Sequence, residues 1–377
     1  MMNPNAVLSL VLPFFICATL IMVLRKHAGS IGLLDRPCQR KQHKGLVPLV
    51  GGIAIWTAFA ISTLLMFFDW STLAMVSIGL LVMALGVLDD VHELGTRKRF
   101  LVQILAGVAM VYLGQLQINQ LGNAFGGGIV QFSGAFAILF TIFSTVGVIN
   151  ALNMIDGMDG LAGSIASISF LALAAVAYAG GDMVSAQILL TIVGSLAAFL
   201  LFNLRVAGHA ARIFMGDAGS MFLGFLLAWF FVALSQGESP VLSAVSAGWI
   251  FGLPLLDISV VMVRRVMAGR SPFAAGRDHL HHLLLDRGLS VNSTLAIIVA
   301  AHAMFVVIGL IGNHNRALEP GLFWLFIGLV VAHLLLSNHY TSIGTDARRQ
   351  AARPNPRVPE DCTHLSHAQP SHKSKRI

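Results

Sequence analysis

The chain has 377 residues, of which 56% are hydrophobic and only 11% are charged; its mean hydropathy is +0.80 and its formal net charge is +7. Because an average soluble domain carries about 25% charged residues, this composition excludes an ordinary soluble protein and favours a polytopic membrane protein. Most basic residues flank apolar runs, as membrane topology alone requires, so the positive charge does not indicate nucleic-acid binding.

Eleven mainly apolar runs approach the length of about 20 residues that a helix needs to cross the hydrocarbon. We therefore predict an all-α membrane protein with about eleven transmembrane helices, at residues 5–24, 46–68, 71–88, 100–118, 131–151, 161–180, 183–203, 218–236, 240–263, 292–312 and 320–338. Arg25 and Lys26 directly follow the first run, and no small-residue cleavage site is evident. We expect that run to be an anchor and not a removed signal peptide.

The distribution of basic residues predicts the orientation in the membrane. Lys and Arg accumulate on the cytoplasmic side. With eleven spans, all of the 24 Lys and Arg residues except Arg316 fall on one side. The N terminus is therefore predicted outside and the C terminus in the cytoplasm. Residues 1–338 form the predicted transmembrane domain, and residues 339–377 a basic, disordered cytoplasmic tail attracted to anionic membrane lipids.

Acidic residues gather at the predicted cytoplasmic ends of two apolar runs. The run at 71–88 ends in Asp89 and Asp90, whose repulsion a cation would relieve; a solvated helix end is the alternative. Asp217 lies between two glycines just before the run at 218–236, where a tight backbone would hold it at the membrane boundary. A simple helix N-cap is the alternative interpretation for Asp217.

The run at 131–151 leads into a polar segment with no Lys or Arg. It carries Asn150, Asn153, Asp156 and Asp159 at a spacing of three residues, which makes them neighbours on a helix surface. Without a local basic partner, these acids are free for a metal or a hydrogen-bonding ligand. Alternatively, Asp156 or Asp159 caps the next helix.

The longest internal cytoplasmic loop, at 264–291, is basic. Its Arg265, Arg277, His279, His281 and His282 suit phosphate oxygens. A zinc site is one alternative, although no Cys is near and the His spacing is poor for tetrahedral binding; a solvated loop without a role is another.

One acid and two histidines lie inside apolar runs. Asp257 shares a helix face with Arg264, so an ion pair is expected there, with a structural or a functional role. His302 and His333 are expected to be satisfied interior residues. Together, the loops offer carboxylates for a hard divalent ion and cations for anionic oxygens, as phosphoryl transfer requires. Mg²⁺ fits this set better than Zn²⁺.

Several motifs resemble the polyprenyl-phosphate sugar-1-phosphate transferase family, in particular its bacterial undecaprenyl-phosphate N-acetylglucosamine branch. The match covers nearly all of residues 20–295. The motifs are Asp35-Arg-Pro, the segment 40–52 with Lys41 and His43, Leu88-Asp89-Asp90, the segment 150–160, Phe214-Met-Gly-Asp217-Ala-Gly-Ser, and Ser271-Pro-Phe through His282.

The resemblance implies a role for each matching residue. Asp217 and Asn153 resemble the family's magnesium-binding pair, with Mn²⁺ as a substitute ion. The implied catalytic residues are Asp89 and Asp90 beside the lipid phosphate, the nucleotide-side acids Asp156 and Asp159, and the phosphate-contacting His279, His281 and His282. The implied substrate-binding residues are Lys41, His43, Asn150, Arg265 and Arg277.

The implied activity is that of a Mg-dependent phosphoglycosyltransferase whose catalytic domain spans residues 1–338. It would transfer N-acetylglucosamine 1-phosphate from UDP-N-acetylglucosamine to undecaprenyl phosphate and release UMP, starting a cell-surface polysaccharide such as O antigen. The active site would face the cytoplasm from the bacterial inner membrane, and a homodimer is compatible with the sequence. The alternatives are another UDP-N-acetylhexosamine or, from a different class, a secondary transporter; the latter usually shows an internal repeat, and none is evident.

Overall fold

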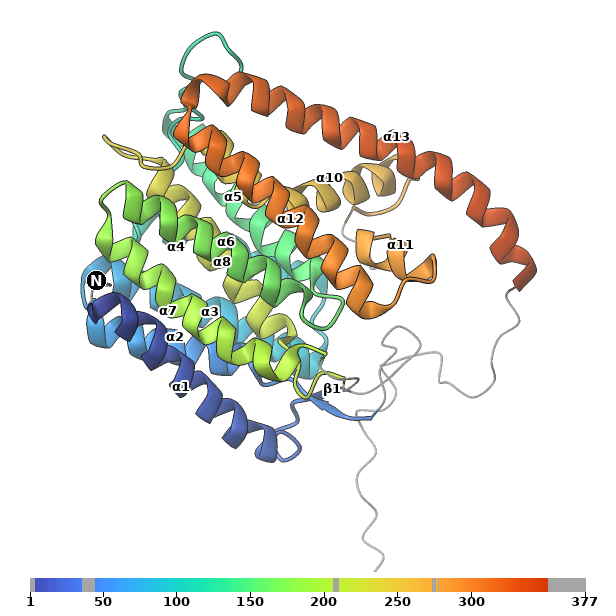
Figure 1. Ribbon diagram of the computed structural model, residues 1–377, viewed down its shortest axis with the longest axis horizontal. Coiled ribbons are helices and arrows are strands. Elements are labelled where there is room, and N and C mark those ends of the chain that lie inside the picture. The colour runs from blue at the N-terminus through green and yellow to red at the C-terminus, as the bar shows by residue number, and fades with distance from the viewer. Residues whose placement is uncertain (1–3, 36–44, 206–209, 273–275, 277, 352–377) are drawn as a thin grey trace, which may run out of the picture.

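The computed structural model describes residues 4–35, 45–205, 210–272, 276 and 278–351, with side chains as far as residue 336. The chain forms a helical bundle with one short hairpin (Figure 1). The elements are α1 (Pro4–His27), β1 (Leu34–Asp35), β2 (Val47–Pro48), α2 (Gly51–Met66), α3 (Trp70–His92), α4 (Thr96–Tyr112), α5 (Gly134–Ile155), α6 (Leu161–Ala179), α7 (Met183–Asn203), α8 (Gly216–Ser235), α9 (Ala244–Ile250), α10 (Gly252–Met267), α11 (Leu280–Asp286), α12 (Val291–His314), η1 (Arg316–Leu318) and α13 (Glu319–Ala351).

The helices confirm the predicted all-α polytopic class. Within the described ranges, eight helices are long and apolar enough to cross a membrane, and α9 with α10 makes a ninth if the bent pair is one span. The two other predicted runs correspond to α2 and α4. Helix α2 has only 16 residues, and the first turn of α4 contains three basic residues, Arg97, Lys98 and Arg99. The number of eleven spans and the orientation stay predictions.

Two predicted elements differ from the structure. The run at 240–263 is not one straight span, because α9 and α10 meet at an angle of 82° around Phe251. Pro254 lies in the first turn of α10, where proline needs no hydrogen-bonded N–H, and this explains why a new helix starts there. The last helix, α13, continues past residue 338 to Ala351. Residues 352–377 of the predicted tail lie outside the described residues.

Helix α8 is the centre of the bundle. It packs against α2, α3, α5 and α6, and nearly all of its residues are buried. Glycines allow the closest of these contacts: a methyl group added to Gly52 or Gly86 would overlap backbone atoms of Gly219 or Ala218. Small residues commonly let helix backbones approach one another inside membranes. The start of α8 is therefore fixed by direct backbone packing.

The connecting segments form two distinct ends of the bundle. β1 and α11 lie at one end in Figure 1, and the loop between α4 and α5 lies at the other. At that second end, Gln236 Oε1 accepts hydrogen bonds from the N–H groups of Asn119 (2.9 Å) and Gln120 (3.1 Å), and Glu319 Oε2 accepts one from Asn123 N–H (2.8 Å). The loops predicted to face outside thus contact each other, while the acidic motifs gather at the first end.

Candidate active site

Asp217 occupies the second position of α8, on a segment that the start of α2 holds in place. The N–H groups of Gly51 and Gly52 donate to the carbonyls of Phe214 (3.0 Å) and Met215 (2.9 Å). These bonds involve only backbone atoms. The position of Asp217 is therefore set by the fold and does not depend on its own side-chain contacts.

Asp90 caps the N-terminus of α8 from the neighbouring helix α3. Its Oδ1 accepts a hydrogen bond from Asp217 N–H (2.9 Å), and its Oδ2 accepts one from Ala218 N–H (3.3 Å). The residue before α8 provides no side-chain cap, so Asp90 satisfies N–H groups that the helix itself leaves without partners. Gly216, at φ +71°, leaves room for the Asp90 carboxylate. The predicted site residue Asp90 thus also orients the start of α8.

Asp89 is buried beside Asp90 and is held by two donors. Leu94 N–H donates to its Oδ1 (2.7 Å), and Arg99 Nη1 donates to its Oδ2 (3.0 Å). The Asp217 carboxyl lies within hydrogen-bonding reach of Asp89, and Arg99 Nη1 is 3.8 Å from Asp217 Oδ2. Two carboxyl groups this close require a shared proton or a cation between them. Arg99 supplies part of that positive charge, a role that the sequence analysis did not assign to it.

Asn153, near the end of α5, contacts Asp217 as the predicted pair requires. Its Nδ2 donates to Asp217 Oδ1 (2.8 Å) and to Ser220 Oγ (2.9 Å). Asn150 lies one turn earlier and faces elsewhere, since its Nδ2 donates to Gln103 Oε1 (2.7 Å) on α4. A substrate-binding role for Asn150 stays a prediction.

Asp89 and Asp217 offer carboxylate oxygens near Arg99, and Asn153 turns its Nδ2 toward Asp217. Within the ranges that the structure describes, no group of three or more His, Cys, Asp and Glu residues is arranged to hold a metal ion. Mg²⁺ is commonly bound by one or two carboxylates together with substrate phosphates and water. Metal ligation by Asp217 and Asn153 stays a prediction.

Asp156 and Asp159 follow the end of α5. Burial raises the pKa of Asp156 to about 8, and the negative charges of Asp217 and Asp159 add to this shift. Asp159 Oδ2 accepts a hydrogen bond from Arg205 Nε (2.6 Å), so the expectation that both acids lack a basic partner is wrong for Asp159. Neither acid caps α6, whose N-cap is Gly160 without a side-chain bond. Arg205 lies in a distant loop, where no sequence pattern connects it to Asp159.

The basic loop reaches the same end of the bundle through α11. His281 packs against Gly157, between Asp156 and Asp159 in the chain, where an added methyl group would overlap its ring. The ring centroids of His281 and His282 are 4.1 Å apart. The predicted histidine cluster therefore adjoins the acidic segment after α5.

Arg265 is 2% exposed at the end of α10. Its Nε donates to Asp278 Oδ2 (3.3 Å) and its Nη1 to Pro272 O (3.1 Å), so Arg265 holds the basic loop against α10. The predicted substrate-binding residues Lys41, His43 and Arg277 lie outside the described residues. Their assignments stay predictions.

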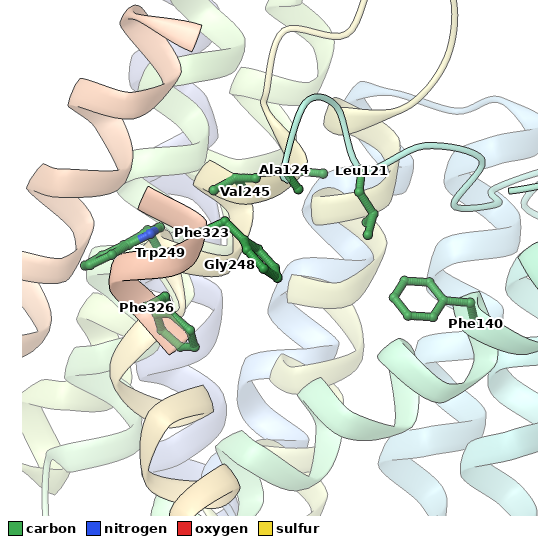
Figure 2. Close-up of a pocket in the computed structure, with 9 residues that line it drawn as sticks. Leu121, Ala124, Phe140, Val245, Gly248, Trp249, Phe323 and Phe326 are labelled. Atoms are coloured by element: carbon green, nitrogen blue, oxygen red, sulfur yellow. The ribbon is translucent and has the colours of Figure 1, made fainter. Parts of the chain in front are cut away.

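A separate cavity of about 230 Å³ lies toward the opposite end of the bundle (Figure 2). Phe140, which lines it, precedes Asn153 by thirteen residues on α5, or about 20 Å of helix. The other lining residues come from the α4–α5 loop, α9 and α13 and are Leu121, Ala124, Ala244, Val245, Gly248, Trp249, Phe323 and Phe326. An apolar lining is unsuited to a nucleotide, so the cavity is not part of the candidate active site.

Comparisons with known proteins identify the family of the chain. The family model for glycosyl transferase family 4 matches residues 72–235, which contain the acidic motifs from Asp89 to Asp217. Over 325 residues, the chain is 35% identical to an undecaprenyl-phosphate alpha-N-acetylglucosaminyl 1-phosphate transferase from Yersinia pestis, covering 86% of this chain and 88% of that protein. A Haemophilus influenzae protein with the same name is 32% identical over 351 residues, covering 92% and 98% of the two chains. The chain therefore belongs to glycosyl transferase family 4, the family of the polyprenyl-phosphate sugar-1-phosphate transferases.

Proposed function

We propose that the chain transfers N-acetylglucosamine 1-phosphate from UDP-N-acetylglucosamine to undecaprenyl phosphate and releases UMP. The observation that carries this proposal is the convergence of Asp89, Asp90, Asn153 and Asp217, from three helices, on one point beside Arg99. The names of the relatives indicate the same lipid and the same sugar. The reaction would take place at the cytoplasmic face of the bacterial inner membrane and start a cell-surface polysaccharide.

The main obstacle to this reaction is repulsion between two phosphate groups. Each pair of unit charges 4 Å apart costs about 4 kcal/mol at an effective dielectric of 20. Bound Mg²⁺ would supply positive charge that lowers this repulsion, and Asp217, Asp89 and Asn153 are the residues that would hold it. Arg99 and the cluster of His279, His281 and His282 would neutralise phosphate oxygens from the protein side.

We propose direct attack by the lipid phosphate on the donor phosphate, without a covalent enzyme intermediate. A phosphomonoester has a second pKa near 6, so at neutral pH it is largely a dianion that needs little help from a base. Both oxygens of Asp89 accept hydrogen bonds, and both oxygens of Asp90 do the same. These bonds lower the nucleophilicity of the carboxylates and favour positioning roles for them.

Two assays of purified protein test the proposal. The first supplies UDP-N-acetylglucosamine, undecaprenyl phosphate and Mg²⁺ and measures UMP, which a transporter or a scaffold would not release. The second omits the lipid and follows exchange of labelled UMP into the sugar nucleotide. Direct attack predicts no exchange without lipid, whereas a covalent intermediate predicts fast exchange. Lipid-independent exchange that disappears in Asp89→Asn would identify Asp89 as a nucleophile and overturn direct attack.

A further inference from the structure

Asp257 on α10 forms a buried hydrogen-bonded pair with His279. Its Oδ2 lies 2.7 Å from His279 Nδ1, and its Oδ1 accepts a hydrogen bond from Leu280 N–H (2.9 Å). Asp257 and His279 are only 3% and 5% exposed. Helical spacing predicted Arg264 as the partner of Asp257, but His279, 22 residues away, takes this place.

This pair fixes both the position and the tautomer of the His279 ring. With Nδ1–H donated to the carboxylate, Nε2 is the ring nitrogen that remains for an external oxygen. Because Leu280 N–H is the first N–H group of α11, Asp257 also holds the N-terminus of that helix. A single carboxylate therefore sets ring orientation and helix position together.

The Asp257–His279 pair also affects how the rest of the histidine cluster is positioned. The rings of His279 and His281 are parallel within 8°, with centroids 6.0 Å apart, and His281 packs against Gly157 beside the acidic segment. Asp257 thus connects α10 to the candidate active site through α11. A buried carboxylate in a mainly apolar helix is costly, and an apolar contact between α10 and α11 would serve packing alone equally well.

We propose that Asp257 is a positioning residue that holds His279 with Nε2 directed at the phosphate groups of the sugar nucleotide. This inference rests on the proposed function. Asp257→Asn keeps an oxygen to accept the Leu280 N–H bond and removes only the charge beside His279, so it should slow turnover through His279. The second partner of the ring would be a phosphate oxygen of the donor, which accepts a hydrogen bond from an imidazole N–H.

A double-mutant cycle on the full-length protein tests the proposal. Asp257→Asn should lower kcat by about 10- to 100-fold, the usual effect of losing a carboxylate that orients a functional histidine. His279→Gln should lower kcat at least as much. The double variant should lose no more activity than His279→Gln alone, because the two residues act as one unit. Asp257→Glu, which retains the carboxylate, should recover part of the activity and remain coupled to His279.

Ser169→Ala is the matched control, because Ser169 Oγ makes a buried hydrogen bond to His302 Nε2 (3.0 Å) in the apolar region and has no part in the site. It should lower the Tm while kcat stays unchanged. Multiplicative losses of kcat in the double variant would overturn the inference, even when wild-type protein releases UMP. Should Asp257→Asn fail to fold, the cycle with Asp257→Glu decides in the same way. Absence of UMP release from wild-type protein would instead overturn the proposed function.

Discussion

Arg99→Met should lower the Mg²⁺ concentration that gives half-maximal velocity. Arg99 Nη1 lies 3.0 Å from Asp89 Oδ2 and 3.8 Å from Asp217 Oδ2, so its positive charge occupies the region where the proposed metal ion would bind. Removing this cation leaves the carboxylates more negative, which strengthens their attraction for a divalent ion. Replacement by methionine keeps most of the side-chain volume and removes the charge.

The size of the effect follows from the distances and the exposure. Two unit charges 4 Å apart interact by about 4 kcal/mol at an effective dielectric of 20. The Arg99 side chain is 29% exposed, and solvent screening reduces the interaction to about 1 kcal/mol. Since about 1.4 kcal/mol corresponds to a tenfold change in affinity, the Mg²⁺ requirement should fall roughly fivefold.

The assay is UMP release measured over a series of buffered Mg²⁺ concentrations at constant ionic strength. Arg97→Met is the control, because Arg97 is exposed on the same helix turn and should leave the requirement unchanged. Arg99→Lys retains the charge and should stay close to wild type. An unchanged or increased Mg²⁺ requirement in Arg99→Met would refute the assignment of Asp217 to the metal site.

Three further predictions test the site and its orientation. Asp217→Asn should reduce activity by orders of magnitude and raise the Mg²⁺ requirement, because an amide is a weaker ligand for a hard cation than a carboxylate; an unchanged requirement would count against the metal site. Because the pKa of Asp156 is raised to about 8 from an unfolded value near 3.9, the folded protein binds one more proton between these pH values, so without metal the Tm should fall as the pH rises through this window. Asp156→Asn should weaken this dependence, with the part due to the adjacent carboxyls of Asp89 and Asp90 remaining; replacing the exposed Glu93 by Gln should leave the dependence unchanged. Single cysteines at Gly127 and Gly95, where a side chain has open space, test the topology. An impermeant thiol reagent added from outside should label the cysteine at 127 and not the one at 95. The reverse labelling would invert the predicted topology.

The sequence was sufficient to predict where the polar groups lie along the chain. Apolar runs predict most of the long helices within about four residues of their observed ends, and polar residues at these ends must meet wherever the helices pack together. The structure brings Asn153 and Asp217 together through a 2.8 Å hydrogen bond. Their proposed metal ligation stays a prediction.

The partners of individual charges could not be predicted in the same way. Arg205 contacts Asp159 across 46 residues, and His279 replaces Arg264 as the partner of Asp257. Such contacts depend on how the helices and loops are oriented relative to one another, which the sequence does not show. The 82° bend around Phe251 is an example, because it directs α10 differently from a straight span. In the sequence, only Gly248, Gly252 and Pro254 near Phe251 indicate that the helix bends there.

The cap that Asp90 places on α8 also has a consequence for biosynthesis. Asp90 and Asp217 are separated by 127 residues, and four long helices lie between them in the chain. At a translation rate of about 5 to 20 residues per second, the ribosome adds this stretch in on the order of ten seconds. During that time, the acids at the end of α3 have no α8 to cap. The insertion of α8 is therefore the step that first brings Asp217 to Asp90, and α10 and α11 must follow before the histidine cluster joins the site.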